Sequence, residues 1–156
     1  MATCFELAEY FLANPDKDEG VSNLKLQKLC AYAQAFSLAL LGSKLFEDNL
    51  EAWTHGPVVP RLYDYYRCHG KNPLPTDVLP EEARRPFSDE ELFILETVNN
   101  FYGRYAAWTL RDMSHNDFPG DFNSKDVIPV NDIRASFADN KIVRSIQEAY
   151  GAPVQA

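Results

Sequence analysis

The sequence predicts a mainly α-helical protein, folded as a single compact domain of about six or seven helices with a small β-hairpin. Apolar residues recur three and four positions apart in several segments, as on one face of a helix. Two pairs, Thr3 with Glu6 and Ser88 with Glu91, have the spacing of a capping box. A length of 156 residues suits one domain.

The first two predicted helices form the N-terminal part of the core. Thr3 caps the first, which ends at Ala13 before Asn14-Pro15. The second begins after Ser22 and ends at Gly42. Its apolar positions are Leu26, Leu29, Cys30, Ala33, Phe36 and Leu40. We expect this long helix to be packed on more than one side and to form the centre of the core.

A change of pattern follows Gly42. Residues 44–46 and 50–53 are short apolar groups around a polar turn, and they predict a β-hairpin or extended pair. The segment 55–60 contains one glycine and two prolines, which exclude a regular helix and indicate a rigid elbow. A third helix then begins at Pro60 and ends at Gly70.

In the C-terminal half, helix N-cap residues and helix-ending glycines and prolines predict the elements. Four prolines (Pro73, Pro75, Pro80 and Pro86) indicate a stiff surface connection. Ser88 caps a fourth helix that ends at Gly103, and a shorter helix is expected over about 105–114. An irregular stretch, 115–127, precedes a short helix around Ile133 and Phe137. Asp139 is the expected cap of a last helix, closed by Gly151. The predicted domain covers 1–151, and 152–156 form a flexible tail.

The charge balance limits the classes of partner. Lys and Arg number 15 against 23 Asp and Glu, which gives a net charge of −8. Such a chain has no electrostatic reason to bind nucleic acid or anionic membrane surfaces. A basic protein is the more natural partner, although excess negative charge also serves solubility.

The cysteines and the apolar segments indicate a cytoplasmic protein. Cys4, Cys30 and Cys68 are odd in number and form no CxxC pattern, so neither a disulfide framework nor a zinc site is expected. The most apolar segment, 24–41, is interrupted by polar residues, and no N-terminal stretch has the pattern of a signal peptide.

No catalytic, cofactor or metal site is predicted. The three histidines, at 55, 69 and 115, lie far apart, and no phosphate-binding glycine motif occurs. Cys68 and His69 are neighbours in the chain, but adjacent helical positions diverge by about 100° around the axis. A buried structural role for the cysteines is favoured. An enzyme that uses Cys30 or Cys68 with His55 or His69 is the less favoured alternative.

The segment 51–63 stands out as either an elbow between elements or a binding surface. Trp53 offers a large apolar anchor with one hydrogen-bond donor, and Gly56 permits close approach of the backbone. Pro57 and Pro60 stiffen the entry to the third helix.

These residues carry a family resemblance. In order along the chain they are SNLKLQKL at 22–29, YAQ at 32–34, LF at 45–46, EAW at 51–53, GPVVP at 56–60 and LY at 62–63. The set resembles the Panacea domain of SocA-like antitoxins, which is also found in phage-associated GepA proteins. A looser similarity covers 88–137 through Leu110, Ser114-His115, Ile128, Ile133 and Phe137. Where the family usually has Pro-Trp after the histidine, this chain has Asp117-Phe118-Pro119-Gly120.

The resemblance implies an antitoxin, which is a protein without catalytic activity that binds and blocks a cognate protein toxin. It also implies an alternative, an adaptor that delivers the toxin to a cytoplasmic AAA+ protease. No cofactor is implied. The candidate residues for partner binding are Lys25, Lys28, Trp53, His55, Arg61 and Tyr63.

Overall fold

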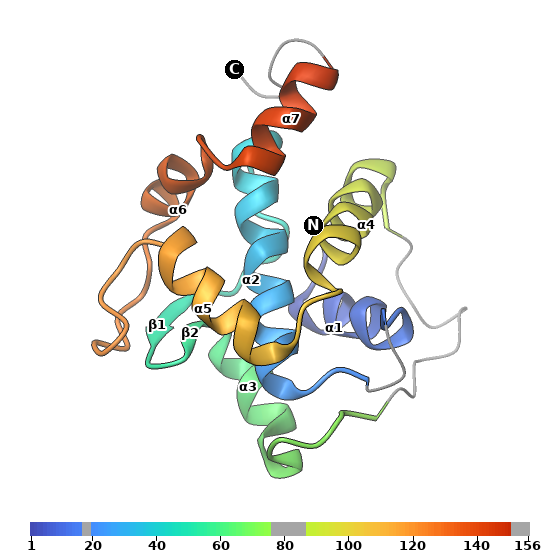
Figure 1. Cartoon of the computed structure of the whole chain (residues 1–156), viewed down its shortest axis with the longest axis vertical. Coiled ribbons are helices and arrows are strands. Elements are labelled where there is room, and N and C mark those ends of the chain that lie inside the picture. Colours follow the sequence, from blue (N-terminus) through green and yellow to red (C-terminus); the bar gives the residue numbers. More distant parts are fainter. Residues whose placement is uncertain (17–19, 76–86, 151–156) are drawn as a thin grey trace.

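The longest helix, α2 (Asn23–Leu40), runs through the middle of the molecule (Figure 1). This computed structural model describes residues 1–16, 20–75 and 87–150. All but three residues of α2 are buried, because the other described helices and the hairpin pack around it. A helix that is apolar on more than one side has to be surrounded in this way. The prediction that α2 forms the centre of the core is confirmed.

Helices α1 (Cys4–Ala13) and α4 (Asp89–Tyr102) contact each other and α2. Both begin with the predicted capping boxes. The Thr3 hydroxyl accepts the Glu6 N–H at 3.2 Å, and the Glu6 carboxylate accepts the Thr3 N–H at 2.9 Å. Ser88 and Glu91 repeat this arrangement. Each box satisfies N–H groups that the first turn of a helix leaves without a partner.

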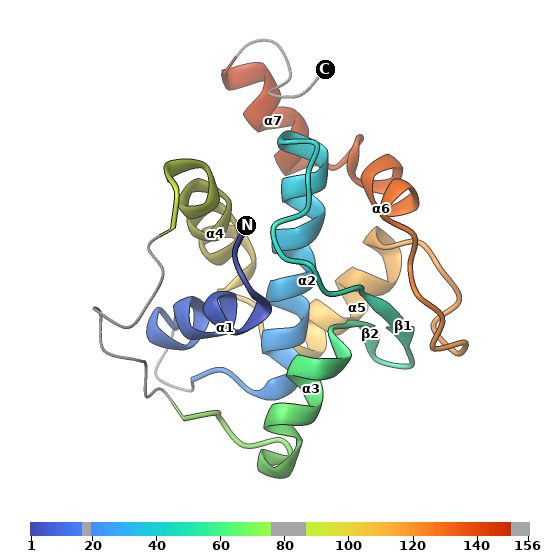
Figure 2. The same ribbon diagram turned by 180° about the vertical axis from the view of Figure 1, so that it is seen from behind.

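The hairpin is formed by β1 (Glu51–Trp53) and β2 (Gly56–Val58), which pair antiparallel with Trp53 opposite Gly56. The predicted pairing of 44–46 with 50–53 is therefore wrong, and the predicted elbow supplies the second strand. The side chain of Gln34 explains the difference. Its Oε1 accepts the N–H groups of Leu45 and Phe46, and its Nε2 donates to the carbonyl of Phe46. Because Gln34 already satisfies these backbone groups, the segment 44–46 needs no partner strand. Figure 2 shows the chain returning along α2 to β1.

The remaining elements follow the predicted order, with small shifts. Helix α3 (Pro60–Tyr66) continues as a 3₁₀ turn, Arg67–His69, to Gly70. Helix α5 (Ala107–Asp117) begins and ends later than the expected 105–114. Helix α6 is Val130–Phe137.

The last helix, α7 (Lys141–Ala149), has a different cap from the predicted one. Asn140, and not Asp139, is the N-cap, because the Asn140 Oδ1 accepts the N–H groups of Ile142 and Val143. Asp and Asn are both favourable N-cap residues, so the residue type does not distinguish Asp139 from Asn140. The helix begins at Lys141, which makes Asn140 the cap.

Residues 17–19, 76–86 and 151–156 are not described. The predictions for Pro80, Pro86, Gly151 and the tail 152–156 therefore lie outside the described residues. Within the described part, no helix has the length and apolar character needed to cross a bilayer.

Candidate functional site

Two amide side chains at the N-terminal end of α2 fix the hairpin and the start of α3. The Gln27 Oε1 accepts the Val59 N–H at 2.9 Å, and its Nε2 donates to the Asn23 Oδ1 at 3.0 Å. Asn23 in turn donates to the carbonyl of Tyr63 at 3.1 Å. Gln27 and Asn23 are both buried. Buried amides that are hydrogen-bonded in this way hold segments that are distant in the sequence in one arrangement.

Lys28 lies behind the hairpin with its side chain fully buried. Its Nζ donates to the carbonyl of Pro57 at 2.7 Å. Burial, together with the nearby charge of Arg111, lowers the pKa of Lys28 to about 7. The cost of removing a charged ammonium from water is the main physical cause.

This burial predicts a pH dependence of stability. The native state holds the Lys28 proton less tightly than the unfolded chain, so between about pH 7 and pH 10 the unfolded state binds more protons and this residue's contribution to stability rises with pH. In Lys28→Met that contribution is absent. We expect the unfolding free energy of the wild type, relative to Lys28→Met, to increase by about 3 kcal/mol between pH 7 and pH 9.5, measured by urea denaturation. A difference that stays constant over this range would contradict the assignment.

One face of α5 holds the turn of the hairpin. The Arg111 Nε donates to the His55 Nδ1 at 3.1 Å, and the His115 Nε2 lies 2.9 Å from the carbonyl of Thr54. Ser114 stands directly against Gly56. Burial and the charges of Arg111, Lys28 and His115 lower the pKa of His55. Positions 111, 114 and 115 lie on one side of a helix, which explains how a short helix contacts the whole turn.

The other edge of the hairpin is paired with the loop after α5. The Ala52 N–H donates to the carbonyl of Asp126 and the Lys125 N–H donates to the carbonyl of Ala52. Lys125 adopts a φ of 62°, which is uncommon outside glycine. The Lys125 Nζ lies 5.4 Å from the centre of the Trp53 ring. The predicted irregular stretch thus gives the hairpin a backbone partner and places a cation on Trp53.

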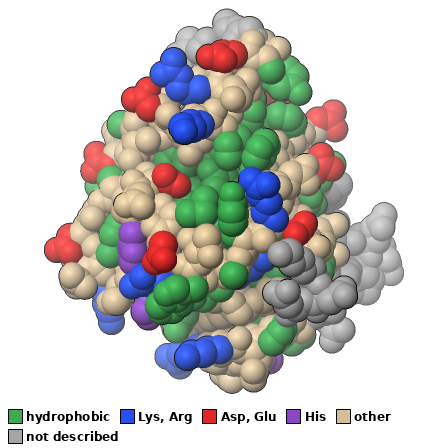
Figure 3. All heavy atoms as spheres, viewed as in Figure 1, with side chains coloured by type: hydrophobic (Ala, Val, Ile, Leu, Met, Phe, Trp, Pro, Cys, Tyr) green, Lys and Arg blue, Asp and Glu red, His purple; other side chains and the backbone are tan. Residues whose placement is uncertain are grey.

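A pocket of about 540 Å³ opens between the start of α2, the hairpin, α3 and the start of α5. Trp53, Tyr63 and Trp108 supply its aromatic lining, and the Trp53 and Tyr63 rings meet edge to face at 5.1 Å. The other lining residues are Ser22, Asn23, Leu24, Gln27, Thr54, His55, Val58, Arg67, Gly70, Lys71, Ala107 and Lys125. We call the pocket with this lining the hairpin pocket. Toward the lower left, Figure 3 shows hydrophobic side chains beside cationic, histidine and acidic side chains.

Three of the six predicted binding residues line the hairpin pocket, namely Trp53, His55 and Tyr63. The other three lie elsewhere. Lys25 donates from its Nζ to the carbonyl of Gly103 at 2.6 Å, and Lys28 is the buried residue behind the hairpin.

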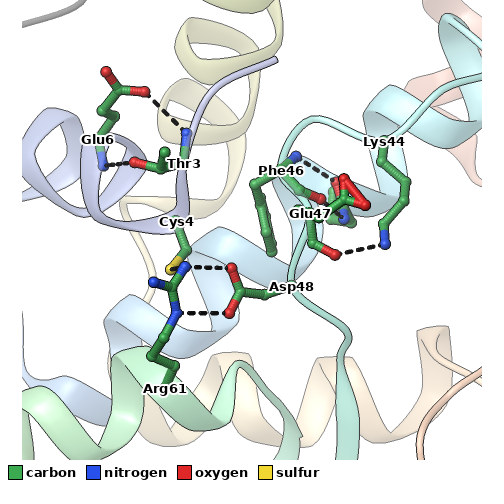
Figure 4. Close-up of polar contacts among 9 residues, drawn as sticks. Thr3, Cys4, Glu6, Lys44, Phe46, Glu47, Asp48 and Arg61 are labelled. Atoms are coloured by element: carbon green, nitrogen blue, oxygen red, sulfur yellow. Dashed lines mark hydrogen bonds and ion pairs between the residues drawn. The ribbon is translucent and has the colours of Figure 1, made fainter.

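Arg61, the sixth, is not among the pocket-lining residues, and Figure 4 shows its side chain beside Cys4 and Asp48. Its Nε and Nη2 contact the two carboxylate oxygens of Asp48 at 3.0 and 2.7 Å. A bidentate pair of this kind fixes both side chains. The Arg61 hydrogen bond lowers the pKa of Asp48. The guanidinium also lies over the Phe5 ring, 5.0 Å from its centre. Arg61 thus joins α3 to α1 and to the segment before β1.

The lining residues that were not predicted as binding residues include the charged or aromatic side chains of Arg67, Lys71, Trp108 and Lys125. They come from the end of α3 and the turn after it, from α5 and from the loop after α5, which only the fold brings together. Trp108 could have been recognised as a candidate. It lies outside the face of α5 that carries the buried residues Leu110 and Ser114. A tryptophan in such a position, here 56% exposed, indicates a contact surface.

The cysteine and histidine side chains do not form a nucleophilic pair in the described residues. Cys30 is fully buried, and burial raises the pKa of its thiol well above the usual value. Cys68 is exposed, and no hydrogen bond joins either cysteine to a histidine in the part of the chain that the structure describes. Across the same residues, no three potential ligands among His, Cys, Asp and Glu gather to hold a metal ion.

Comparison with known proteins identifies a family. The model of a family described as "Antitoxin SocA-like, Panacea domain" matches residues 26–119, more than half of the chain. No curated protein and no solved structure matches the chain. The matched residues run from α2 through α5 and include the hairpin.

Proposed function

The chain belongs to the SocA-like antitoxin family of Panacea-domain proteins, and we propose that it neutralises a cognate protein toxin by binding it directly. The family match carries this proposal. Its support in the structure is that the matched region supplies most of the lining of the hairpin pocket, and that buried hydrogen bonds of Gln27 and Asn23 hold the surrounding segments in place. A surface fixed before binding loses less entropy when a partner docks.

We infer that the protein acts by binding and not by catalysis. A thiol needs its ionised form to act as a nucleophile, and burial of Cys30 opposes ionisation. The hairpin pocket combines tryptophan, tyrosine and arginine, the residue types that contribute most to protein interfaces. We place this activity in the cytoplasm, in keeping with the three free cysteines.

The charge supports a toxin that is basic overall. A net charge of −8 attracts a basic protein over several ångströms and speeds the encounter. Added salt screens such attraction, so association should slow as the ionic strength rises.

Co-expression tests the proposal. We expect the chain to restore growth to cells that produce the toxic protein encoded beside it, and a tagged chain to retain that protein during purification. The control is the same toxin expressed without the chain. Growth that is not restored, together with no recovered complex, would overturn the proposal.

The same cells separate neutralisation from delivery to an AAA+ protease. Direct neutralisation leaves the half-life of the toxin unchanged, and it restores growth equally in a strain without the protease. An adaptor shortens the half-life of the toxin only where the protease is present, so rescue that depends on the protease would replace direct neutralisation by delivery.

A further inference from the structure

We propose that the hairpin pocket receives an acidic segment of the toxin, with an apolar side chain inserted between Trp53, Tyr63 and Trp108. This inference rests on the proposed function and adds the chemistry of the contact. The inference concerns only the toxin segment that contacts the pocket. The long-range attraction between the two proteins depends instead on the net charge of the whole toxin.

The charge inside the pocket is opposite to that of the whole chain. Arg67, Lys71 and Lys125 line it, and the lining within the described residues includes no Asp or Glu. Two carboxylates border the lining: the Asp64 Oδ1 lies 3.7 Å from the Arg67 Nη1 in an exposed ion pair, and Glu51 accepts from Trp53. Three lining cations outnumber them and form a local positive region in a chain with 23 acidic and 15 basic residues. Concave surfaces of one charge concentrate the field inside them. Carboxylates of a partner are therefore favoured here.

The aromatic lining calls for an apolar anchor. Trp53 and Tyr63 are half-buried, whereas Trp108, which also lines the pocket, is 56% exposed. The Trp53 Nε1 already donates to a Glu51 carboxylate oxygen at 2.9 Å. Its polar atom is thus satisfied within the chain, and the ring contributes apolar surface to the pocket lining. The volume of about 540 Å³ lies in the range of ligand pockets and is large enough for one or two side chains.

The cations around these rings are held in place. Arg111 lies over Trp108, 4.7 Å from the ring centre, and also donates to His55. Lys125 lies over Trp53 from a left-handed backbone position that the pairing with Ala52 maintains. Backbone strain of this kind is concentrated at binding sites, where it fixes a side chain in advance.

A short protein segment suits the pocket better than a nucleic acid does. Aromatic rings with cations also bind single strands, but such binding uses a positive groove that follows many phosphates. Here three cations line one pocket of a chain with a net charge of −8, which repels a long polyanion.

Two variants test the inference against the toxin encoded beside the chain. Lys125→Glu reverses a pocket charge, and Trp108→Ala removes the exposed ring. We expect each to weaken toxin binding in calorimetry by about tenfold or more. The matched controls are Lys141→Glu on α7 and Phe101→Ala on α4, both exposed and outside the pocket lining. They should bind as the wild type does. Circular dichroism of each of the four variants is the check that it folds as the wild type does.

The outcomes separate the two proposals. A wild type that binds no toxin overturns the proposed function and this inference together. A wild type that binds, with pocket variants of unchanged affinity, overturns the inference alone. Overlapping toxin peptides give a second readout: we expect the wild type to capture peptides with Asp or Glu beside an apolar residue, and Lys125→Glu to lose them. Capture of basic peptides only, or Trp108-dependent binding of a labelled single-stranded oligonucleotide in their place, would also overturn it.

Discussion

Gly56→Ala should destabilise the protein by about 2–6 kcal/mol, the sum of backbone strain and crowding. Gly56 has a φ of 109°, which side chains rarely tolerate. A Cβ there would lie 2.7 Å from the Ser114 Oγ and 3.0 Å from the Lys28 Cε. Both neighbours are buried, so neither moves away easily. In a domain of this size we expect the melting temperature to fall by about 10 °C.

Gly70→Ala is the matched control, because Gly70 also has a positive φ, 56°, but a Cβ there meets no atom within 4 Å. This substitution should lower the free energy of unfolding only by the cost of backbone strain, about 1–3 kcal/mol. In the double variant Gly56→Ala with Ser114→Ala, part of the crowding is relieved, so its loss should be smaller than the sum of the single losses. Equal losses for Gly56→Ala and Gly70→Ala, with additive behaviour in the double variant, would show that the contact with Ser114 does not matter.

Tyr32→Ala should cost about 3–5 kcal/mol, as expected for a large aromatic residue removed from a core. Tyr32 is fully buried in α2. Its ring stacks on Tyr102 at 4.0 Å and meets Phe118 and Phe137 edge to face. One side chain thus joins α2 to α4, to α6 and to the end of α5. Thermal or urea denaturation measures the loss.

Tyr32→Phe separates the hydroxyl from the ring. The Tyr32 hydroxyl donates to the Asp117 Oδ2 at 2.6 Å. Burial, together with this carboxylate, raises the pKa of Tyr32 far above its usual value, so the hydroxyl remains a donor at working pH. The phenylalanine variant keeps the stacking and should lose about 2 kcal/mol, as expected for a hydrogen bond to a carboxylate. If it loses as much as Tyr32→Ala, the hydrogen bond and not the aromatic cluster is the main contribution.

The periodic parts of the fold could be predicted because their signals are local. Both capping boxes and the apolar positions of α2 appear in the sequence as they do in the structure. The hairpin was misplaced because Gln34 supplies hydrogen bonds to Leu45 and Phe46 from another element. A side chain that replaces a strand partner leaves no mark in the local pattern.

The site was only partly predictable for a related reason. Trp53, His55 and Tyr63 belong to one segment with unusual composition, so they could be found as a group. Arg67, Lys71, Trp108 and Lys125 complete the lining from other segments. Their charge and aromatic character become a site only when α5 and the loop after it close on the hairpin.

Titration of the purified toxin tests the central proposal, direct neutralisation, most directly. The toxin's own activity is measured while the purified chain is added, with no protease and no other cellular protein present. The proposal predicts that the activity falls in proportion to the added chain and reaches a low plateau. Toxin activity that stays unchanged in an excess of folded chain would contradict direct neutralisation.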